Sequence, residues 1–306
     1  MSDFWRGRQV LCTGSEGLIG RPLCRMLYER GAIPIRYDKE VGLDILTFHD
    51  FLRYMQNYPP SIVIHLAALS NVGQCRPIPH ETFRVLALGT VNVLEACRLH
   101  PVDALVTASS NHVYGQQVAS KMPTGEDAQL NHLDAYSVSK ICADYMARSY
   151  GKVYGLPVSI IRNTNCFGPD DPHDDHIVPS TISALLRGDS IQLRSDGKTR
   201  KGYLYVDDVA EAYLDVAQWT TENRSCGEAF NVTGETLPTL ELVERIAQVM
   251  GVKAKIKMGT ADPLDYDEQL DDSKIRVVVG WRPRHSLDDA LRLTVEGFKA
   301  RKGVPA

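Results

Sequence analysis

A glycine-rich turn, Thr13-Gly14-Ser15-Glu16-Gly17-Leu18-Ile19-Gly20, joins the apolar run Gln9–Thr13 to the amphipathic segment Leu18–Arg30. We interpret these neighbours as a strand and a helix. Glycines at such a turn let the backbone approach a pyrophosphate, whose negative charge is stabilised at the positive end of the helix. The stretch therefore predicts a dinucleotide site. Because the spacing is GxxGxxG, the pattern by itself also fits a purely structural turn.

Asp38 strengthens the dinucleotide interpretation, because it lies 24 residues after Gly14, at the end of a second apolar run. An acid at that place accepts hydrogen bonds from the adenosine ribose and repels a 2′-phosphate, which favours NAD over NADP. Arg36 and Lys39 lie beside it, so the sequence leaves NADP open. The alternative interpretation of Asp38 is an ordinary turn residue after a strand.

Strand and helix signals alternate through the first half of the chain. Helical spacing of apolar residues continues over Glu81–Leu99 and Asp134–Tyr154. Further apolar runs predict strands at Ile33–Tyr37, Ile62–Leu66, Ala104–Ala108 and Val158–Arg162. Such alternation predicts parallel strands joined by right-handed crossovers, that is, an α/β fold with a Rossmann-like doubly wound parallel sheet.

Shorter elements follow a polar loop at Pro169–His176. They are expected at Pro179–Leu186, Gly202–Val206, Asp208–Gln218, Phe230–Val232, Leu240–Met250 and Leu287–Phe298. We expect a dinucleotide-binding domain over residues 1–167, to which 203–235 return. Residues 168–306 are expected to form mainly a smaller α/β substrate lobe over the strand ends, where open α/β sheets bind ligands.

Composition excludes several classes of protein. The net charge is -4, from 34 basic and 38 acidic residues, which argues against nucleic-acid binding. No apolar run approaches the roughly 20 residues that cross a bilayer, and the first residues lack the apolar stretch of a signal peptide. The 7 cysteines contain no CxxC pair and are interpreted as reduced thiols. We expect a cytoplasmic enzyme without a membrane or nucleic-acid partner.

Tyr136 and Lys140 are the first catalytic candidates. Four residues along a helix place the phenol and the ammonium one turn apart on the same face. A phenol with a pKa near 10 is a poor base at pH 7, and lowering that pKa by about 3 units requires about 4 kcal/mol. The neighbouring ammonium and a cationic nicotinamide ring are expected to supply this stabilisation of the phenolate. The alternative is a surface tyrosine beside a solvated lysine.

Ser109 and Ser110 follow the fourth predicted strand, at the edge that faces the cofactor crevice. A serine there can hydrogen-bond the substrate oxygen that Tyr136 deprotonates; a serine that caps the turn is the alternative. The loop Pro169–His176 combines carboxylates with histidines, but proline-flanked polar loops are typically solvated surface. We therefore expect no metal site.

Motifs in a fixed order carry a wider resemblance: TGSEGLIG at 13–20, Asp38, HLAA at 65–68, SSNHVYG at 109–115, YSVSK at 136–140, RNTNCFGP at 162–169, YLYVDDVA at 203–210 and GWRP at 280–283. Over nearly its whole length the chain resembles the extended short-chain dehydrogenase/reductase family, the NAD-dependent nucleotide-sugar epimerases and dehydratases. The resemblance implies a bound NAD, a nucleotide-diphosphate sugar substrate and a homodimer formed through the helices at 81–99 and 134–154.

The resemblance also implies roles for individual residues. Tyr136 is the base, Lys140 holds the nicotinamide ribose and lowers the tyrosine pKa, and Ser110 is their hydrogen-bonding partner. The implied cofactor residues are Gly14, Gly17, Leu18, Ile19, Gly20, Asp38, Asp44, Ile45, Ala67, Ala68, Ser109, Tyr136, Lys140 and Asn163. The implied substrate residues are Ser110, Asn111, Asn165, Ile177, Arg200 and Lys201.

The chain departs from the family at four positions. Leu86 replaces a frequent cofactor-contacting Asn, and Ser70 replaces a Lys of some epimerases. Asn111 and His112 stand where sugar 4,6-dehydratases of this family usually carry an acid followed by Glu or Lys. Asn cannot donate a proton as a general acid, although His112 can.

These departures decide between reactions. The segments around 176–188 and 194–208 look most like the CDP-glucose 4,6-dehydratase branch, whereas the missing acid favours an epimerase. We expect a 4-epimerase that oxidises the sugar at C4 through a transient 4-keto intermediate. A CDP- or dTDP-glucose-type 4,6-dehydratase with His112 as substitute acid or base is the first alternative. A non-catalytic NAD-binding sensor is the alternative from another class. The sequence leaves the nucleobase, the sugar and the inward-facing residues among 266–268 open.

Overall fold

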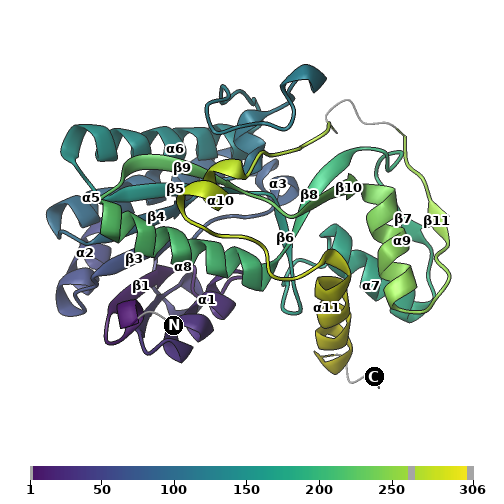
Figure 1. Ribbon diagram of the computed structural model, residues 1–306, viewed down its shortest axis with the longest axis horizontal. Helices are drawn as coiled ribbons and strands as arrows, with labels where there is room; N and C mark the ends of the chain where they lie inside the picture. Colours follow the sequence, from purple (N-terminus) through teal and green to yellow (C-terminus); the bar gives the residue numbers. More distant parts are fainter. Residues whose placement is uncertain (1–2, 261–265, 302–306) are drawn as a thin grey trace.

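A central sheet of six parallel strands organises the computed structural model, which describes residues 3–260 and 266–301. The strand order is β2 (Ile33–Tyr37), β1 (Gln9–Thr13), β3 (Ile62–His65), β4 (Ala104–Ala108), β5 (Val158–Asn163) and β9 (Cys226–Val232) (Figure 1). The chain order reverses between β1 and β3, and open α/β sheets bind ligands at the carboxyl ends beside such a reversal.

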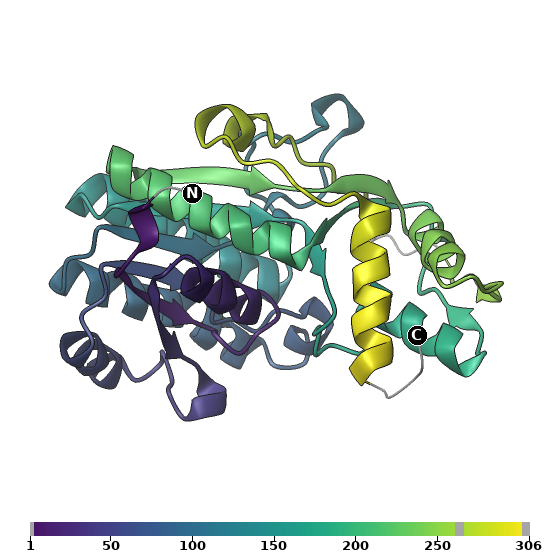
Figure 2. The same ribbon diagram turned by 60° about the horizontal axis from the view of Figure 1, so that its bottom comes forward.

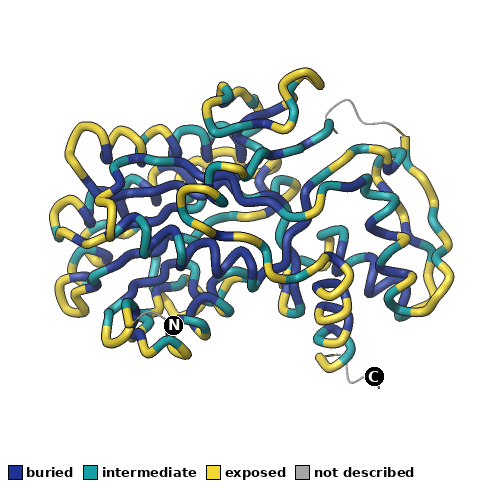
Figure 3. The backbone as a smooth tube through the Cα atoms, in the orientation of Figure 1, coloured by how far each residue is buried: buried dark blue, intermediate teal, exposed yellow. Residues whose placement is uncertain are grey.

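Helices cover both faces of this sheet. One face carries α1 (Gly20–Glu29) and α8 (Val206–Asn223); the other carries α2 (Phe48–Asn57), α5 (Gly89–Leu99) and α6 (Ala135–Tyr154). Figure 3 shows the strands between them as the most buried part of the tube. Because both faces are covered, the strands are continuous apolar runs. The expected α/β class with a doubly wound parallel sheet is confirmed.

Several elements differ from the sequence-based expectation, three of them in the first half of the chain as follows. Helix α1 begins at Gly20 and not at Leu18, because the glycine turn continues through Ile19. The segment expected as one helix over 81–99 is α4 (Pro79–Phe83), a π-helical turn at Arg84–Leu88 and α5. Helix α2 was not predicted, since its buried apolar stripe consists only of Phe51 and Met55.

A smaller α/β region lies beyond the carboxyl ends of the main sheet (Figure 2). Its strands form two sheets, β10 (Glu235–Pro238), β8 (Arg200–Tyr205) and β6 (Asn165–Phe167), and β11 (Ile256–Lys257) with β7 (Ile191–Gln192). Its helices are α7 (Ile177–Arg187), α9 (Thr239–Val249) and α11 (Leu287–Arg301). These elements share a separate apolar core that includes Phe167, Ile182, Leu242 and Phe298.

The chain returns to the large core twice after residue 168. Helix α8 and strand β9 pack into the main sheet, and so do Ile275, from α10 (Ser273–Val278), and Trp281. The Trp281 indole also donates a hydrogen bond to the Asp208 carbonyl oxygen at 3.1 Å. The division at residue 167 stays a prediction. Within the described residues, no helix has the length and apolarity that spanning a bilayer requires.

Candidate active site

Helix α6 presents the two main catalytic candidates from its first two turns. Asp134 caps the helix by accepting a hydrogen bond from the Ser137 amide at 3.0 Å. Tyr136 and Lys140 follow, and both are buried, at 7% and 5% exposure. The alternative of a surface tyrosine beside a solvated lysine is therefore excluded by burial.

Lys140 and Ser110 meet at the boundary between α6 and the end of β4. The Lys140 ammonium donates a hydrogen bond to the Ala108 carbonyl oxygen at 2.8 Å. Burial lowers the pKa of Lys140 to about 8. Ser110, two residues beyond Ala108, hydrogen-bonds the phenol of Tyr136. The strand end and the helix thus bring Ser110, Tyr136 and Lys140 into one site.

In the protein chain alone, the pKa of Tyr136 is raised and not lowered. Burial raises the pKa of Tyr136 to about 12, and only the hydrogen bond from Ser110 acts to lower it among its leading influences. The ammonium of Lys140 is directed at the Ala108 carbonyl oxygen. The helical spacing therefore does not by itself ionise the phenol, and Tyr136 is neutral at pH 7 in the protein chain alone.

An apolar wall lies behind Tyr136. Leu86 and Cys75 are buried against it, and Ala68 packs on the same cluster. Leu86 belongs to the π-helical turn between α4 and α5. Such turns often occur at functional sites. Leu86, the departure noted in the sequence, thus contributes packing beside the phenol rather than a polar contact.

The glycine turn fits a dinucleotide. Gly14 has a φ of +72°, and a Cβ there would lie 2.6 Å from the backbone nitrogen of Ala67. A Cβ at Gly20 would collide with the Gly14 carbonyl oxygen, whereas Gly17 is less restricted. Leu18 and Ile19 pack against the core of the smaller region. The glycines therefore leave the backbone of the turn free of side chains, as close approach of a pyrophosphate requires.

Asp38 is tied to this turn. Its carboxylate accepts hydrogen bonds from the Glu16 amide at 2.9 Å and the Glu40 amide at 3.0 Å. Arg36 is paired with the Glu16 carboxylate at 2.6 Å. The carboxylates of Glu16, in the turn after β1, and Asp38, after β2, therefore both lie at this edge of the sheet, and Glu16 neutralises the charge of Arg36. This arrangement disfavours a 2′-phosphate.

The remaining cofactor candidates lie around the same sheet edge. Asp44 accepts a hydrogen bond from the Leu46 amide at 2.9 Å, and buried Ile45 contacts the start of α5 at Gly89. The Ser109 hydroxyl already donates a hydrogen bond to the Asp144 carboxylate, at 2.9 Å inside the core. Asn163, at the end of β5, donates to the Thr164 carbonyl oxygen at 3.0 Å.

The substrate candidates come from β6, α7 and β8. Asn165 is half-buried on β6, and Ile177 is the first residue of α7. Arg200 is exposed and donates to the Thr236 carbonyl oxygen at 2.8 Å. Lys201 lies 3.4 Å from the carboxylate of Glu268. Lys201 is thereby connected, through that carboxylate, to Asn111 and His112.

Glu268 is the site residue that sequence reasoning did not single out. Its carboxylate accepts a hydrogen bond from the Asn111 amide at 2.5 Å and lies 3.6 Å from His112 Nδ1. Of residues 266–268 it alone is buried. No local sequence signal pointed to it, because contact between residues 157 apart leaves none.

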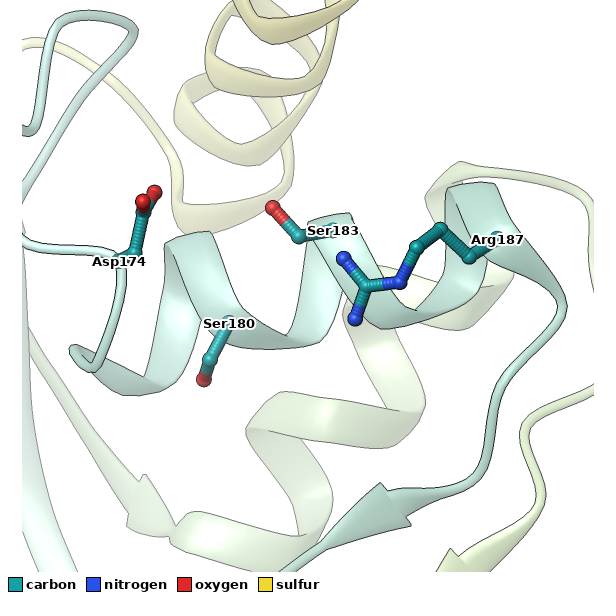
Figure 4. Close-up of a pocket in the computed structure, with 4 residues that line it drawn as sticks. All are labelled: Asp174, Ser180, Ser183 and Arg187. Carbon is teal, nitrogen blue, oxygen red and sulfur yellow. The ribbon is translucent and has the colours of Figure 1, made fainter.

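The polar loop before α7 gathers donor atoms of His173, Asp175 and His176 within 4.8 Å. Each already has a partner: Ser70 for His173 at 3.0 Å, Asn71 for Asp175 and Asp171 for His176 at 2.9 Å. Nearby, a hollow of about 250 Å³ is lined by Asp174, Ser180, Ser183 and Arg187, the last three from successive turns of α7 (Figure 4). None of the predicted catalytic residues lines this hollow.

Comparison with known proteins identifies the family. The NAD dependent epimerase/dehydratase family matches residues 10–233. The chain belongs to this family. The UDP-glucose 4-epimerase of Mycolicibacterium smegmatis is 32% identical over 315 residues, covering 95% of this chain and 98% of that protein. The dTDP-glucose 4,6-dehydratase of Haemophilus influenzae is 26% identical, covering 94% and 97%.

A solved structure extends the likeness to three dimensions. The UDP-glucose 4-epimerase of Thermus thermophilus in complex with NAD matches with a TM-score of 0.85 and 28% identity, covering 95% of this chain and 99% of that chain. The likeness to an epimerase therefore spans the whole α/β architecture described above. The comparisons confirm that the chain belongs to the expected family, that it is an enzyme and that its cofactor is NAD.

Proposed function

We propose that this NAD-dependent enzyme is a nucleotide-sugar 4-epimerase. The arrangement of Ser110, Tyr136 and Lys140 beside the glycine turn carries the proposal. The M. smegmatis relative, similar over nearly its full length, is a UDP-glucose 4-epimerase, which supports the same reaction. NAD, when bound, takes the hydride from C4 of the sugar and later returns it.

Tyr136 takes the proton of the C4 hydroxyl, and Ser110 holds the same oxygen. A transient 4-keto sugar results, turns in the pocket and is reduced from its other face, whereupon Tyr136 returns the proton. Because burial raises the pKa of Tyr136 to about 12, additional positive charge near the phenol must lower it for base catalysis at neutral pH. Lys140 faces the sheet edge where its ammonium can also hold a ribose hydroxyl.

The substrate proposed is a nucleotide-diphosphate sugar. Asn165 lies on β6 and Ile177 begins α7 in the smaller region, and Arg200 offers an exposed guanidinium for the diphosphate. The complete catalytic set argues against a non-catalytic NAD sensor, since a sensor has no need of a buried Ser110, Tyr136 and Lys140.

A 4,6-dehydratase is the second candidate, and one observation favours it. The ring of His112 stands edge-on to Tyr136 with centroids 6.0 Å apart, so a second acid–base group adjoins the oxidising one. Dehydration across C5 and C6 needs such a group, whereas 4-epimerisation does not. The H. influenzae relative named above is a dehydratase.

Product analysis separates the two. The protein is incubated with UDP-, CDP- and dTDP-glucose, and the products are followed by NMR. Formation of the 4-epimer supports the leading proposal, and a stable 4-keto-6-deoxy sugar assigns the dehydratase instead. Absence of either product with every nucleotide would leave the sensor as the better description.

We also propose a cytoplasmic homodimer formed through α5 and α6. Helix α6 carries apolar residues that are not buried, among them Val138, Ile141, Cys142, Tyr145 and Met146. Tyr145 is 51% exposed, and Leu99 on α5 is 50% exposed. Light scattering on the purified protein tests the dimer, and Tyr145→Glu is expected to produce monomers.

A further inference from the structure

The loop between β6 and α7, residues 169–176 and here called the strap, is hydrogen-bonded to the segment after β3. The Ser70 hydroxyl of that segment lies 3.0 Å from His173 Nε2. The Asn71 side-chain amide donates to both oxygens of the Asp175 carboxylate, at 2.9 and 2.8 Å. Asn71 is buried, at 6% exposure, and hydrogen bonds to a charged group are stronger than neutral ones. The strap is therefore fastened to the main sheet.

Both ends of the strap are anchored in the smaller region. At its start, Pro169 contacts α11, because a Cβ on Gly297 would lie 2.4 Å from Pro169 Cβ. At its end, His176 leads directly into α7. Between the ends, the buried Asp171 carboxylate accepts from the His173 amide at 3.0 Å and pairs with His176 Nδ1 at 2.9 Å. The strap thus has internal bonds that hold its bend, so it can detach from the segment after β3 as one unit.

The glycine turn is connected to both partners of this fastening. Gly14 touches the segment after β3, because a Cβ on Gly14 would lie 2.6 Å from the Ala67 nitrogen. Gly168, which precedes the strap, lies against the other side of the turn, since a Cβ there would lie 3.9 Å from Leu18 Cδ1. The turn, the segment after β3 and the strap therefore form a continuous circuit of contacts.

We propose that the strap is a gate for NAD, which must release Ser70 and Asn71 before the dinucleotide can enter or leave the glycine turn. This inference goes beyond the proposed function, because it needs bound NAD but no particular reaction of the sugar. Epimerisation and loss of water both leave the sugar at its original oxidation level, so NAD ends each cycle unreduced. Turnover then requires no exchange of the cofactor, and a closed gate retains it while nucleotide sugars come and go.

A gate has a kinetic signature that a direct contact with the cofactor lacks. Bonds that only close the gate stabilise the free and the NAD-loaded protein equally, so loosening them raises the rates of NAD entry and release by the same factor. The dissociation constant, which is the ratio of release to entry, then stays unchanged. Loosening a strap that binds NAD directly would raise the release rate alone and would weaken the affinity.

The test measures NAD exchange on the full-length protein and on its Asp175→Ala and Ser70→Ala variants. Protein loaded with radiolabelled NAD is mixed with excess unlabelled NAD, and loss of label from the protein gives the release rate. Uptake of label by NAD-free protein gives the entry rate. We expect both rates to rise about tenfold in Asp175→Ala and less in Ser70→Ala, because the bond to the charged carboxylate is the stronger.

Asp174→Ala is the matched control. Asp174 is the neighbouring carboxylate on the strap; it is exposed and lines the hollow on α7 (Figure 4). Its removal changes the charge of the strap as Asp175→Ala does, and should leave both exchange rates unchanged. An equal rise in this control would overturn the gate, because charge and not the bond to Asn71 would then govern exchange.

Ser70→Ala keeps the test open should Asp175→Ala not fold, which circular dichroism reveals. Exchange rates unchanged in both variants overturn the gate. Faster release without faster entry also overturns it, since the strap would then be a direct contact of the cofactor. None of these results bears on the reaction of the sugar, which product analysis tests separately.

Discussion

Arg162 and Asp144 form a two-point ion pair in which both side chains have 0% exposure. Arg162 Nε lies 2.9 Å from Asp144 Oδ2, and the second bond, to Oδ1, is 2.8 Å long. Asp144 also accepts from Ser109, and Arg162 donates to the Tyr114 hydroxyl at 2.8 Å. The pair therefore locks β5 and α6 to the segment after β4 that carries Ser110, so the positions of the catalytic groups depend on it.

Removing one partner leaves an unpaired buried charge. We expect Arg162→Met to lower the free energy of unfolding by about 3–5 kcal/mol, measured by urea denaturation. Arg53→Ala is the control, because its pair with Asp50 is exposed and such pairs contribute about 0–1 kcal/mol. Equal losses in the two variants would contradict the importance assigned to burial.

His65 makes the fold sensitive to acid. Its ring lies between the hydroxyls of Thr13 at 2.7 Å and Thr90 at 3.1 Å, and burial, with the charge of Lys140, lowers its pKa to about 3. In the unfolded chain, His65 binds a proton near pH 6.5. Above that pH the neutral His65 therefore leaves the free energy of unfolding at its full value. It falls as the pH drops towards 3, by at most about 5 kcal/mol.

The prediction for His65 is checked by the free energy of unfolding as a function of pH. His65→Gln should be less stable at pH 7 but should lose less stability between pH 6.5 and 3. His49→Gln, at an exposed position, serves as control. Parallel curves for the wild type and His65→Gln would show that another group governs the acid response.

Tyr136→Phe removes the proposed base while keeping the ring that packs on Leu86. We expect kcat to fall about 10²- to 10⁴-fold, as loss of a general acid–base group does. NAD content after purification should stay unchanged. Tyr145→Phe, an exposed tyrosine on the same helix, should retain wild-type turnover. Wild-type turnover in Tyr136→Phe would refute its role.

Glu16 and Asp38 together are expected to exclude NADP. Glu16 neutralises Arg36, whose guanidinium would otherwise hold a 2′-phosphate. Glu16→Ala should therefore raise the affinity for NADP relative to that for NAD by about tenfold, which is about 1.4 kcal/mol, measured as the ratio of the two dissociation constants. Glu40→Ala, an exposed neighbour, should not. If Glu16→Ala leaves the preference for NAD over NADP unchanged, Asp38 alone excludes NADP.

Catalysis is expected to be independent of metal ions. The donor groups of His173, Asp175 and His176 are within 4.8 Å of one another, but all take part in hydrogen bonds of the loop. Dialysis against EDTA should change turnover less than about twofold. The Asp175→Asn substitution should likewise change turnover less than about twofold. Activity lost on dialysis and restored by a divalent cation would reverse this expectation.

Much of the fold could be predicted because its signals are local. Apolar runs of β1 to β5 and the helical spacing of α6 identify elements that are buried on characteristic faces. Short elements such as β7 and β11 were missed, since two-residue strands leave no periodicity. Helix α2 was missed because its apolar stripe is narrow.

The sequence by itself determined the glycine turn and the one-turn separation of Tyr136 from Lys140, because both follow from backbone geometry over a few residues. The tertiary structure decided where those groups point and what surrounds them. Packing directs the Lys140 ammonium to the Ala108 carbonyl oxygen and buries Tyr136, so its pKa rises in the chain alone. Folding also brings Glu268 to Asn111 and His112, since contacts between distant residues arise only when the whole chain has packed.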